Sequence, residues 1–224
     1  MGDHPDRGAL IAPARGRRLT AGDLARDPLE VARSLLGTYL VGRGVTLRLT
    51  EVEAYHGEVD PGSHGYRGVT PRTRVMFGPA GHLYVYRSYG IHWCCNIVCG
   101  TKGECAAVLV RAGEVVAGQD VVADRRPDVV TRDRARGPGR LTRAMAIDGE
   151  DNGAPLTGAA APFVLYAPSE RVPDPLVRTG PRVGVSGPGG DGTAFPWRYW
   201  IDGEPSVSVY RPGKPRKGER AGRG

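Results

Sequence analysis

The segment 82–98 constrains the fold more than any other part of the chain. Apolar and aromatic residues lie on both sides of Tyr89-Gly90, which has the composition of a turn, so the segment predicts a β-hairpin. A further hairpin is predicted earlier, where 39–41 and 45–55 flank Gly42-Arg43-Gly44. Strands joined by such short turns are antiparallel. Four more short strands are predicted at 106–111, 163–166, 198–201 and 206–210.

Helices are predicted in fewer places. Asp27 is followed by Pro28 and Glu30, which is a typical helix start: a capping side chain, a proline in the first turn and a glutamate three residues after the cap. Two further helices are predicted at 118–126 and 139–147. Because strands outnumber helices and pair mostly as hairpins, we predict a single α+β domain, in which several helices pack on a mainly antiparallel, curved sheet.

The ends of the chain differ from its middle. Residues 1–19 and 212–224 are rich in arginine, proline and glycine, so we expect a mobile basic arm, a folded domain at 20–211 and a disordered basic tail. No apolar run approaches the roughly 20 residues that cross a bilayer, and no signal peptide is evident. We therefore expect a cytoplasmic protein that does not bind membranes. We also expect it to act as a monomer.

The charge balance favours a polyanionic partner. The formal net charge is +7, with 31 basic and 24 acidic residues. A basic soluble protein without such a partner remains the alternative.

The four cysteines contain no C-x-x-C pair, and adjacent Cys94 and Cys95 would point to opposite faces of a strand. We therefore expect buried reduced thiols, and neither a metal nor an organic cofactor.

Two carboxylates interrupt an apolar face. Glu51, Glu53 and Tyr55 share the parity of the apolar residues at 45, 47 and 49, so in a strand they project the same way, about 6.6–6.8 Å apart. Such a break in the pattern is where functional residues tend to occur. The alternative is an edge strand with two solvated glutamates.

Aromatic residues and arginines alternate over the next segment. Rings that stack on bases and guanidinium groups that bind phosphates are typical of nucleic-acid binding, although many of these rings could simply fill the core. Tyr89 fits the core least, because Ser88-Tyr89-Gly90 places a large ring at a hairpin tip, where it could enter a duplex as a wedge. The residues concerned are Tyr55, Tyr66, Phe77, Tyr84, Tyr86, Tyr89 and Trp93, with Arg67, Arg72, Arg74, Arg87 and Arg111.

These residues belong to longer motifs that occur in a fixed order. The motifs are Glu51-Val52-Glu53-Ala54-Tyr55, His64, the segment 70–77, the segment 83–90, Cys94-Cys95-Asn96, Arg111, Gly137-Pro138-Gly139-Arg140-Leu141 and Arg182-Val183-Gly184-Val185. Together they resemble the alkyladenine (3-methyladenine) DNA glycosylase family, over about residues 29–211. The resemblance implies a base-excision-repair enzyme that flips a damaged purine out of double-stranded DNA and hydrolyses its N-glycosidic bond.

The resemblance also implies a role for each matching residue. Glu53 would activate the water, helped by Arg111, and Tyr89 would fill the gap that the flipped base leaves. The base pocket would consist of Tyr55, His64, Tyr86 and Asn96. Within it, Asn96 would oppose the 2-amino group of guanine. The residues expected to contact the DNA backbone are Arg72, Arg74, Arg87 and His92. Around the wedge, Arg87, Ser88 and His92 depart from the residues usual in the family.

Other activities remain open at this stage. Glu51 and Glu53 could serve a nucleoside or sugar glycosidase as an acid/base pair, and the arginines and aromatics could serve a non-catalytic DNA-binding protein. Strand cleavage by a lyase route needs an amine, and Lys102 is the only lysine within the predicted domain, so we expect base excision alone. The sequence does not rank 3-methyladenine, 7-methylguanine, hypoxanthine and ethenoadenine as substrates.

Overall fold

The computed structural model describes residues 16–214. Most of the arm predicted at 1–19 and of the tail predicted at 212–224 therefore lies outside the described residues. Residues 16–19 run beside the sheet: Leu19 donates its N–H to the carbonyl of Leu165 at 2.8 Å, and Ala167 donates to the carbonyl of Arg17 at 2.8 Å.

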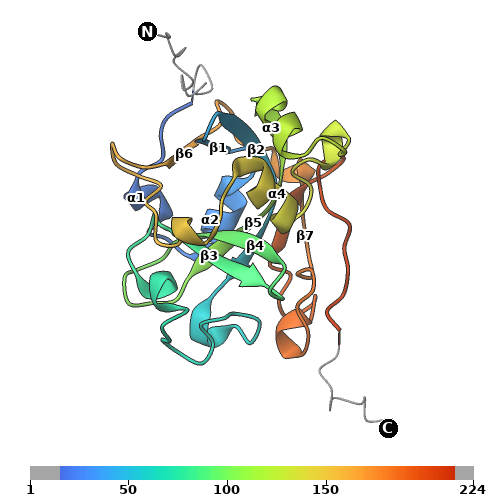
Figure 1. The fold of residues 1–224 in the computed structure, drawn as a ribbon. Coiled ribbons are helices and arrows are strands. Elements are labelled where there is room, and N and C mark those ends of the chain that lie inside the picture. The colour runs from blue at the N-terminus through green and yellow to red at the C-terminus, as the bar shows by residue number, and fades with distance from the viewer. Residues whose placement is uncertain (1–15, 215–224) are drawn as a thin grey trace.

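One open sheet organises the molecule, and the predicted α+β class is confirmed (Figure 1). The strand order is β3-β4-β5-β2-β1-β6, with β8 paired to β2 and β7 to β8, and every named pair is antiparallel. The described part of the chain contains eight strands: β1 (Tyr39–Gly42), β2 (Val45–Tyr55), β3 (Leu83–Ser88), β4 (His92–Val98), β5 (Ala107–Ala117), β6 (Phe163–Tyr166), β7 (Val177–Gly180) and β8 (Arg198–Ile201).

Four α-helices accompany the sheet within residues 16–214: α1 (Ala21–Leu24), α2 (Pro28–Leu35), α3 (Gln119–Arg125) and α4 (Pro138–Met145). The predicted start of α2 is confirmed, since the Asp27 carboxylate accepts the N–H groups of Leu29 and Glu30. Helix α2 packs on β2 and β5, and α4 packs on β4 and β5. The apolar core lies between these helices and the sheet.

The prediction of a strand at 206–210 is wrong. No strand forms there, because the backbone groups of Ser208 are used by side chains: its N–H donates to Glu51 at 2.7 Å, and its carbonyl accepts from Arg198 at 2.8 Å. Two elements were not predicted, α1 and β7, each of only four residues and too short to show a period.

Strand β2 is interior where it carries the two carboxylates. It pairs with β5 along most of its length, and its other side pairs with β1 at 45–48 and with β8 at 51–53. Glu51 and Glu53 therefore have neighbouring strands on both sides, and both side chains are 0% exposed. The alternative of an edge strand with two solvated glutamates is excluded. Register shifts on both sides of Glu51 mark a bulge at this point.

Candidate active site

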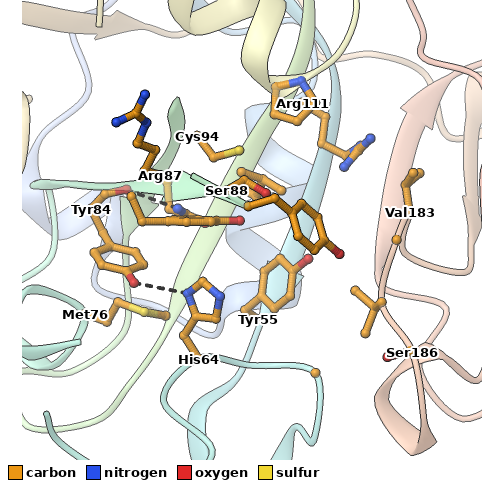
Figure 2. A pocket seen from close by; sticks show the side chains of 18 of the residues that line it. Tyr55, His64, Met76, Tyr84, Arg87, Ser88, Cys94, Arg111, Val183 and Ser186 are labelled. Carbon is orange, nitrogen blue, oxygen red and sulfur yellow. Dashed lines mark hydrogen bonds between the residues drawn. The ribbon is translucent and has the colours of Figure 1, made fainter. Parts of the chain in front are cut away.

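A cavity of about 1140 Å³ opens beside the β3–β4 hairpin. Its walls come from segments that are far apart in sequence: the end of β2, the loop that follows it, the hairpin, the segment 183–186 and the chain near Lys214. Figure 2 shows Tyr55 and His64 next to each other on one wall, with Arg111 and Val183 across the cavity. The predicted site residues that line it are Tyr55, His64, Arg72, Tyr86, Arg87, Tyr89, Asn96 and Arg111.

Glu53 does not itself line this cavity, but it contacts three residues that do. The Tyr55 hydroxyl donates a hydrogen bond to its Oε2 at 2.9 Å, and the backbone N–H of Val183 donates to its Oε1 at 2.6 Å. The Nε atom of Arg111 is 3.4 Å from the same Oε1. Each carboxylate oxygen has two lone pairs, so Glu53 can accept a further hydrogen bond from water.

Glu51 has a different environment, although it is equally buried. Its Oε1 accepts from Arg111 at 2.9 Å, from Arg198 at 2.7 Å and from the Ser208 hydroxyl at 2.9 Å. Its Oε2 accepts from the Ser208 N–H at 2.7 Å. Four donors therefore surround Glu51, as expected for a carboxylate that holds other groups in place.

Arg111 lies between the two carboxylates. Burial opposes its positive charge, but the charges of Glu53 and Glu51 outweigh burial and raise the Arg111 pKa. Its Nη2 also donates to the Ser208 hydroxyl at 3.3 Å. Arg111 is therefore a fixed cation beside Glu53.

Aromatic side chains form the walls of the cavity. The rings of Tyr84 and Tyr86 stack with centroids 5.6 Å apart, and the His64 ring meets the Tyr86 ring edge-on at 4.6 Å. His64 Nδ1 shares a hydrogen bond of 3.1 Å with the Tyr84 hydroxyl (Figure 2). The Asn96 amide donates to the Tyr84 carbonyl at 3.1 Å, which fixes its position in the pocket.

His64 is an uncharged ring at neutral pH. Desolvation by the residues packed around it, and then the positive charge of Arg72, lower its pKa to about 4. The Arg72 guanidinium also lies 5.4 Å from the centroid of the Tyr86 ring. Burial, and then the nearby carboxylate of Glu53, raise the pKa of Tyr55 well above 10, so its hydroxyl stays a donor.

Tyr89 lies at the tip of the β3–β4 hairpin, which confirms the predicted turn. Its side chain is 90% exposed, and Tyr89 and Gly90 both have positive φ, 49° and 68°. This conformation is unfavourable for a tyrosine, so the tip holds a large apolar ring in solvent at a cost in strain. The neighbouring Ile91 is also exposed.

Two of the residues predicted to contact DNA, Arg72 and Arg87, line the cavity. The Arg87 guanidinium lies 5.7 Å from the centroid of the Trp93 ring. His92 begins β4 at the base of the hairpin tip and is exposed, and Arg74 is exposed on a 3₁₀ turn. Neither Arg74 nor His92 lines the cavity.

Sequence reasoning missed several groups at this site. It did not identify the Val183 N–H, Arg198 or Ser208, because their contacts with the glutamates span 130–157 residues of chain. Lys214 lies outside the predicted domain, yet it lines the cavity. Only the Arg182-Val183-Gly184-Val185 motif pointed to this side of the pocket.

In the acidic turn 148–151, Asp148 and Glu150 are exposed, whereas Asp151 is buried and binds Arg43 at 2.6 Å. All four cysteines are buried and free of disulfides, and Cys94 lines the cavity. Within residues 16–214 no group of histidine, cysteine and acidic side chains is arranged to hold a metal ion, and no helix there is long and apolar enough to cross a membrane.

Comparison with known proteins decides the family. Residues 22–205 match the model of the family described as methylpurine-DNA glycosylase. The chain belongs to that family. A relative from Frankia casuarinae is 49% identical over 211 residues, covering 90% of this chain and 98% of its own length. One from Streptomyces avermitilis is 47% identical, covering 93% and 99%, and one from Leifsonia xyli is 51% identical, covering 82% and 88%. All three carry the provisional name 3-methyladenine DNA glycosylase.

The residues that match the methylpurine-DNA glycosylase family include nearly all of the candidate active site. Glu53, Arg111 and Val183 lie within the matched range. Ser208 and Lys214 follow it, yet one binds Glu51 and the other lines the cavity. The site therefore extends beyond the part of the chain that the family model covers.

Proposed function

We propose that the protein is a monofunctional, purine-specific DNA glycosylase of base-excision repair. It flips an alkylated or deaminated purine out of the duplex and hydrolyses the N-glycosidic bond with water activated by Glu53. The observation that carries this proposal is a buried carboxylate that contacts residues lining an aromatic cavity, beside a fixed guanidinium. The substrates are purines of the 3-methyladenine, 7-methylguanine, hypoxanthine and ethenoadenine class.

Glu53 acts as the general base. As the water oxygen bonds to C1′ of the sugar, the C1′–N bond breaks, its electron pair leaves with the purine, and Glu53 takes the water proton. Tyr55 and the Val183 N–H hold the carboxylate, and Arg111 helps to hold the water. A cationic alkylated base leaves readily, so one general base suffices for it.

The aromatic walls bind the flipped base. Tyr55, His64 and Tyr86 sandwich it, and each ring that stacks on a base contributes about 1–3 kcal/mol, which offsets the cost of unstacking. The His64 backbone N–H reads the edge of the base. Asn96 sits where the 2-amino group of a normal guanine would project, and so opposes that base.

The exposed Tyr89 fills the gap that the flipped nucleotide leaves. Around it, Arg72, Arg74, Arg87 and His92 contact the DNA backbone, consistent with the net charge of +7. The folded glycosylase domain spans 20–211, flanked by basic segments at 1–19 and 212–224, and the enzyme acts as a monomer in the cytoplasm.

Excision proceeds without strand cleavage. Of the two lysines among the described residues, Lys214 lines the cavity and Lys102 does not. We propose that water activated by Glu53, and not the Lys214 amine, is the nucleophile. If an amine attacked C1′ instead, sodium borohydride would trap a covalent enzyme–DNA complex, and Lys214→Ala would abolish it. We expect no trapped complex, and strand breaks only after alkaline treatment.

The deciding experiment is a panel of duplexes that each carry one of the four lesions, with undamaged duplex and free nucleosides as controls. We expect release of free base from lesion duplexes only. Hydrolysis of free nucleosides alone would indicate a nucleoside glycosidase. Tight lesion binding without base release would indicate a non-catalytic binding protein.

A further inference from the structure

A buried guanidinium contacts Tyr55, one of the residues that line the cavity. Arg182 is the largest fully buried side chain among the described residues. Its Nη1 donates to Asp60 Oδ2 at 2.5 Å and to the Ala54 carbonyl at 2.9 Å. Its Nη2 donates to Asp60 Oδ1 at 2.6 Å and to the Gly189 carbonyl at 2.8 Å. The two-pronged pair with Asp60 fixes both the position and the orientation of the guanidinium plane.

This guanidinium supports the ring of Tyr55. The Arg182 Cζ atom lies 4.5 Å from the centroid of that ring, and 5.3 Å and 5.8 Å from the centroids of Trp197 and Phe195. Arg182 Nε has no hydrogen-bond partner among the described residues, and the three rings lie around the guanidinium that contains it. Because the guanidinium cannot shift, it holds the Tyr55 ring, which lines the cavity.

Arg182 also controls both hydrogen bonds that Glu53 accepts. One donor is the hydroxyl of the supported Tyr55 ring, at 2.9 Å from Glu53. The other is the backbone N–H of Val183, the next residue in the chain after Arg182, at 2.6 Å. A displacement of Arg182 would therefore move the base-stacking ring and both carboxylate contacts together.

Asp60 extends the connection to the loop that carries His64. Its carboxylate accepts the N–H groups of His56 at 3.2 Å and of Gly62 at 2.8 Å, which turns the chain towards His64. Gly62 packs so closely that an added Cβ would lie 2.5 Å from Arg182 Nη2. The absence of a side chain at Gly62 therefore leaves room for the guanidinium directly beside the loop.

We infer that the Arg182–Asp60 pair is a positioning unit for base excision, an inference that rests on the proposed function. The pair holds Tyr55 and Val183 so that both donors reach Glu53 and keep it aligned for the water. Neither residue of the pair touches the reacting atoms. Their role is to fix the groups that do.

The test uses Arg182→Lys, which keeps the charge but loses the two-pronged contact, and Asp60→Asn, which keeps the shape but loses the charge. Arg48→Lys is the matched control, because Arg48 also lies in an ion-pair network, with Glu114 and Glu204, but outside the cavity. Each protein is assayed for single-turnover excision from pH 5 to 9, for lesion binding and for melting temperature.

We expect both pair variants to lower the plateau rate by about 10-fold to 100-fold while lesion binding stays within several-fold, since small misplacements near the chemistry have effects of that size. The acid limb of the pH–rate profile should move to higher pH, because a carboxylate that loses hydrogen-bond donors is protonated more easily. Arg48→Lys should lower the melting temperature without changing the rate or the profile.

Two results would overturn the inference. If the folded fraction of either pair variant, measured from its melting curve, excises with the wild-type rate and profile, the pair is only structural. If Arg182→Lys does not fold, Asp60→Asn still tests whether the pair is only structural. If the wild-type protein releases no damaged base, the proposed function is refuted, and the inference with it. If the wild-type protein is active and the pair variants excise as it does, only the inference is refuted.

Discussion

The hydroxyl of Tyr55 donates a hydrogen bond of 2.9 Å to the carboxylate of Glu53, two residues earlier on the same strand. One residue therefore forms a wall of the cavity and also holds the buried carboxylate. The ring and the carboxylate lie close together because residues i and i+2 of a strand project from the same face. If a base stacks on this ring as proposed, base binding and the proposed chemistry are connected through a single side chain.

Glu53→Gln should remove nearly all excision, with a loss of about 10²-fold to 10⁴-fold, while lesion binding stays within several-fold. A neutral amide keeps the shape of the side chain but cannot take a proton from water. Single-turnover excision and a binding titration on the same lesion duplex measure the two effects separately.

Glu51→Gln is the matched comparison. Glu51 accepts four hydrogen bonds, so its substitution should act on stability, by about 3–5 kcal/mol of unfolding free energy. Excision by the folded fraction should fall much less than in Glu53→Gln. An inactive Glu51→Gln beside an active Glu53→Gln would reverse the assignment.

Tyr89→Ser should weaken flipping by about the 1–3 kcal/mol that one aromatic stack contributes. Excision from a paired lesion should then fall by roughly 5-fold to 150-fold, and excision from a mismatched or single-stranded lesion by less. The side chain is 90% exposed, so the melting temperature should hardly change. Tyr89→Phe keeps the ring and should remain active. Equal losses on paired and unpaired lesions would refute the wedge.

Lesion binding should weaken as the salt concentration rises. In a plot of log affinity against log salt concentration, the slope should be about −0.9 for each phosphate that the protein neutralises. Deleting residues 215–224 removes four basic side chains and one acidic one, so the slope should become shallower. Excision at saturating enzyme should not change. The deletion stops short of Arg211, whose carbonyl accepts the Gly184 N–H at 2.9 Å. Lost chemistry would place the deleted segment in the active site.

His64 should titrate near pH 4, below the value of about 6.5 expected in the unfolded chain. The unfolded chain then takes up this proton first, so the contribution of His64 to stability is complete above about pH 6.5 and falls as the pH drops towards 4. NMR titration of the imidazole, assigned with His64→Gln, measures the pKa directly. A midpoint near 6.5 would contradict the prediction.

The sequence by itself determined the features that depend on near neighbours. Asp27, Pro28 and Glu30 predicted the start of α2, and the turn at Tyr89-Gly90 predicted a hairpin with an exposed ring. These elements follow from capping, turn chemistry and side-chain periodicity, which act over a few residues. The antiparallel α+β class followed from the number of such hairpins.

Only the tertiary structure decided how the two glutamates differ. Glu51 and Glu53 have the same residue type, burial and strand, and they are distinguished by Val183, Arg198 and Ser208, which are 130–157 residues away in the chain. The same contacts turned the predicted strand at 206–210 into a segment that binds Glu51. Hydrogen bonds between such distant residues depend on how the whole chain packs, and no local pattern encodes them.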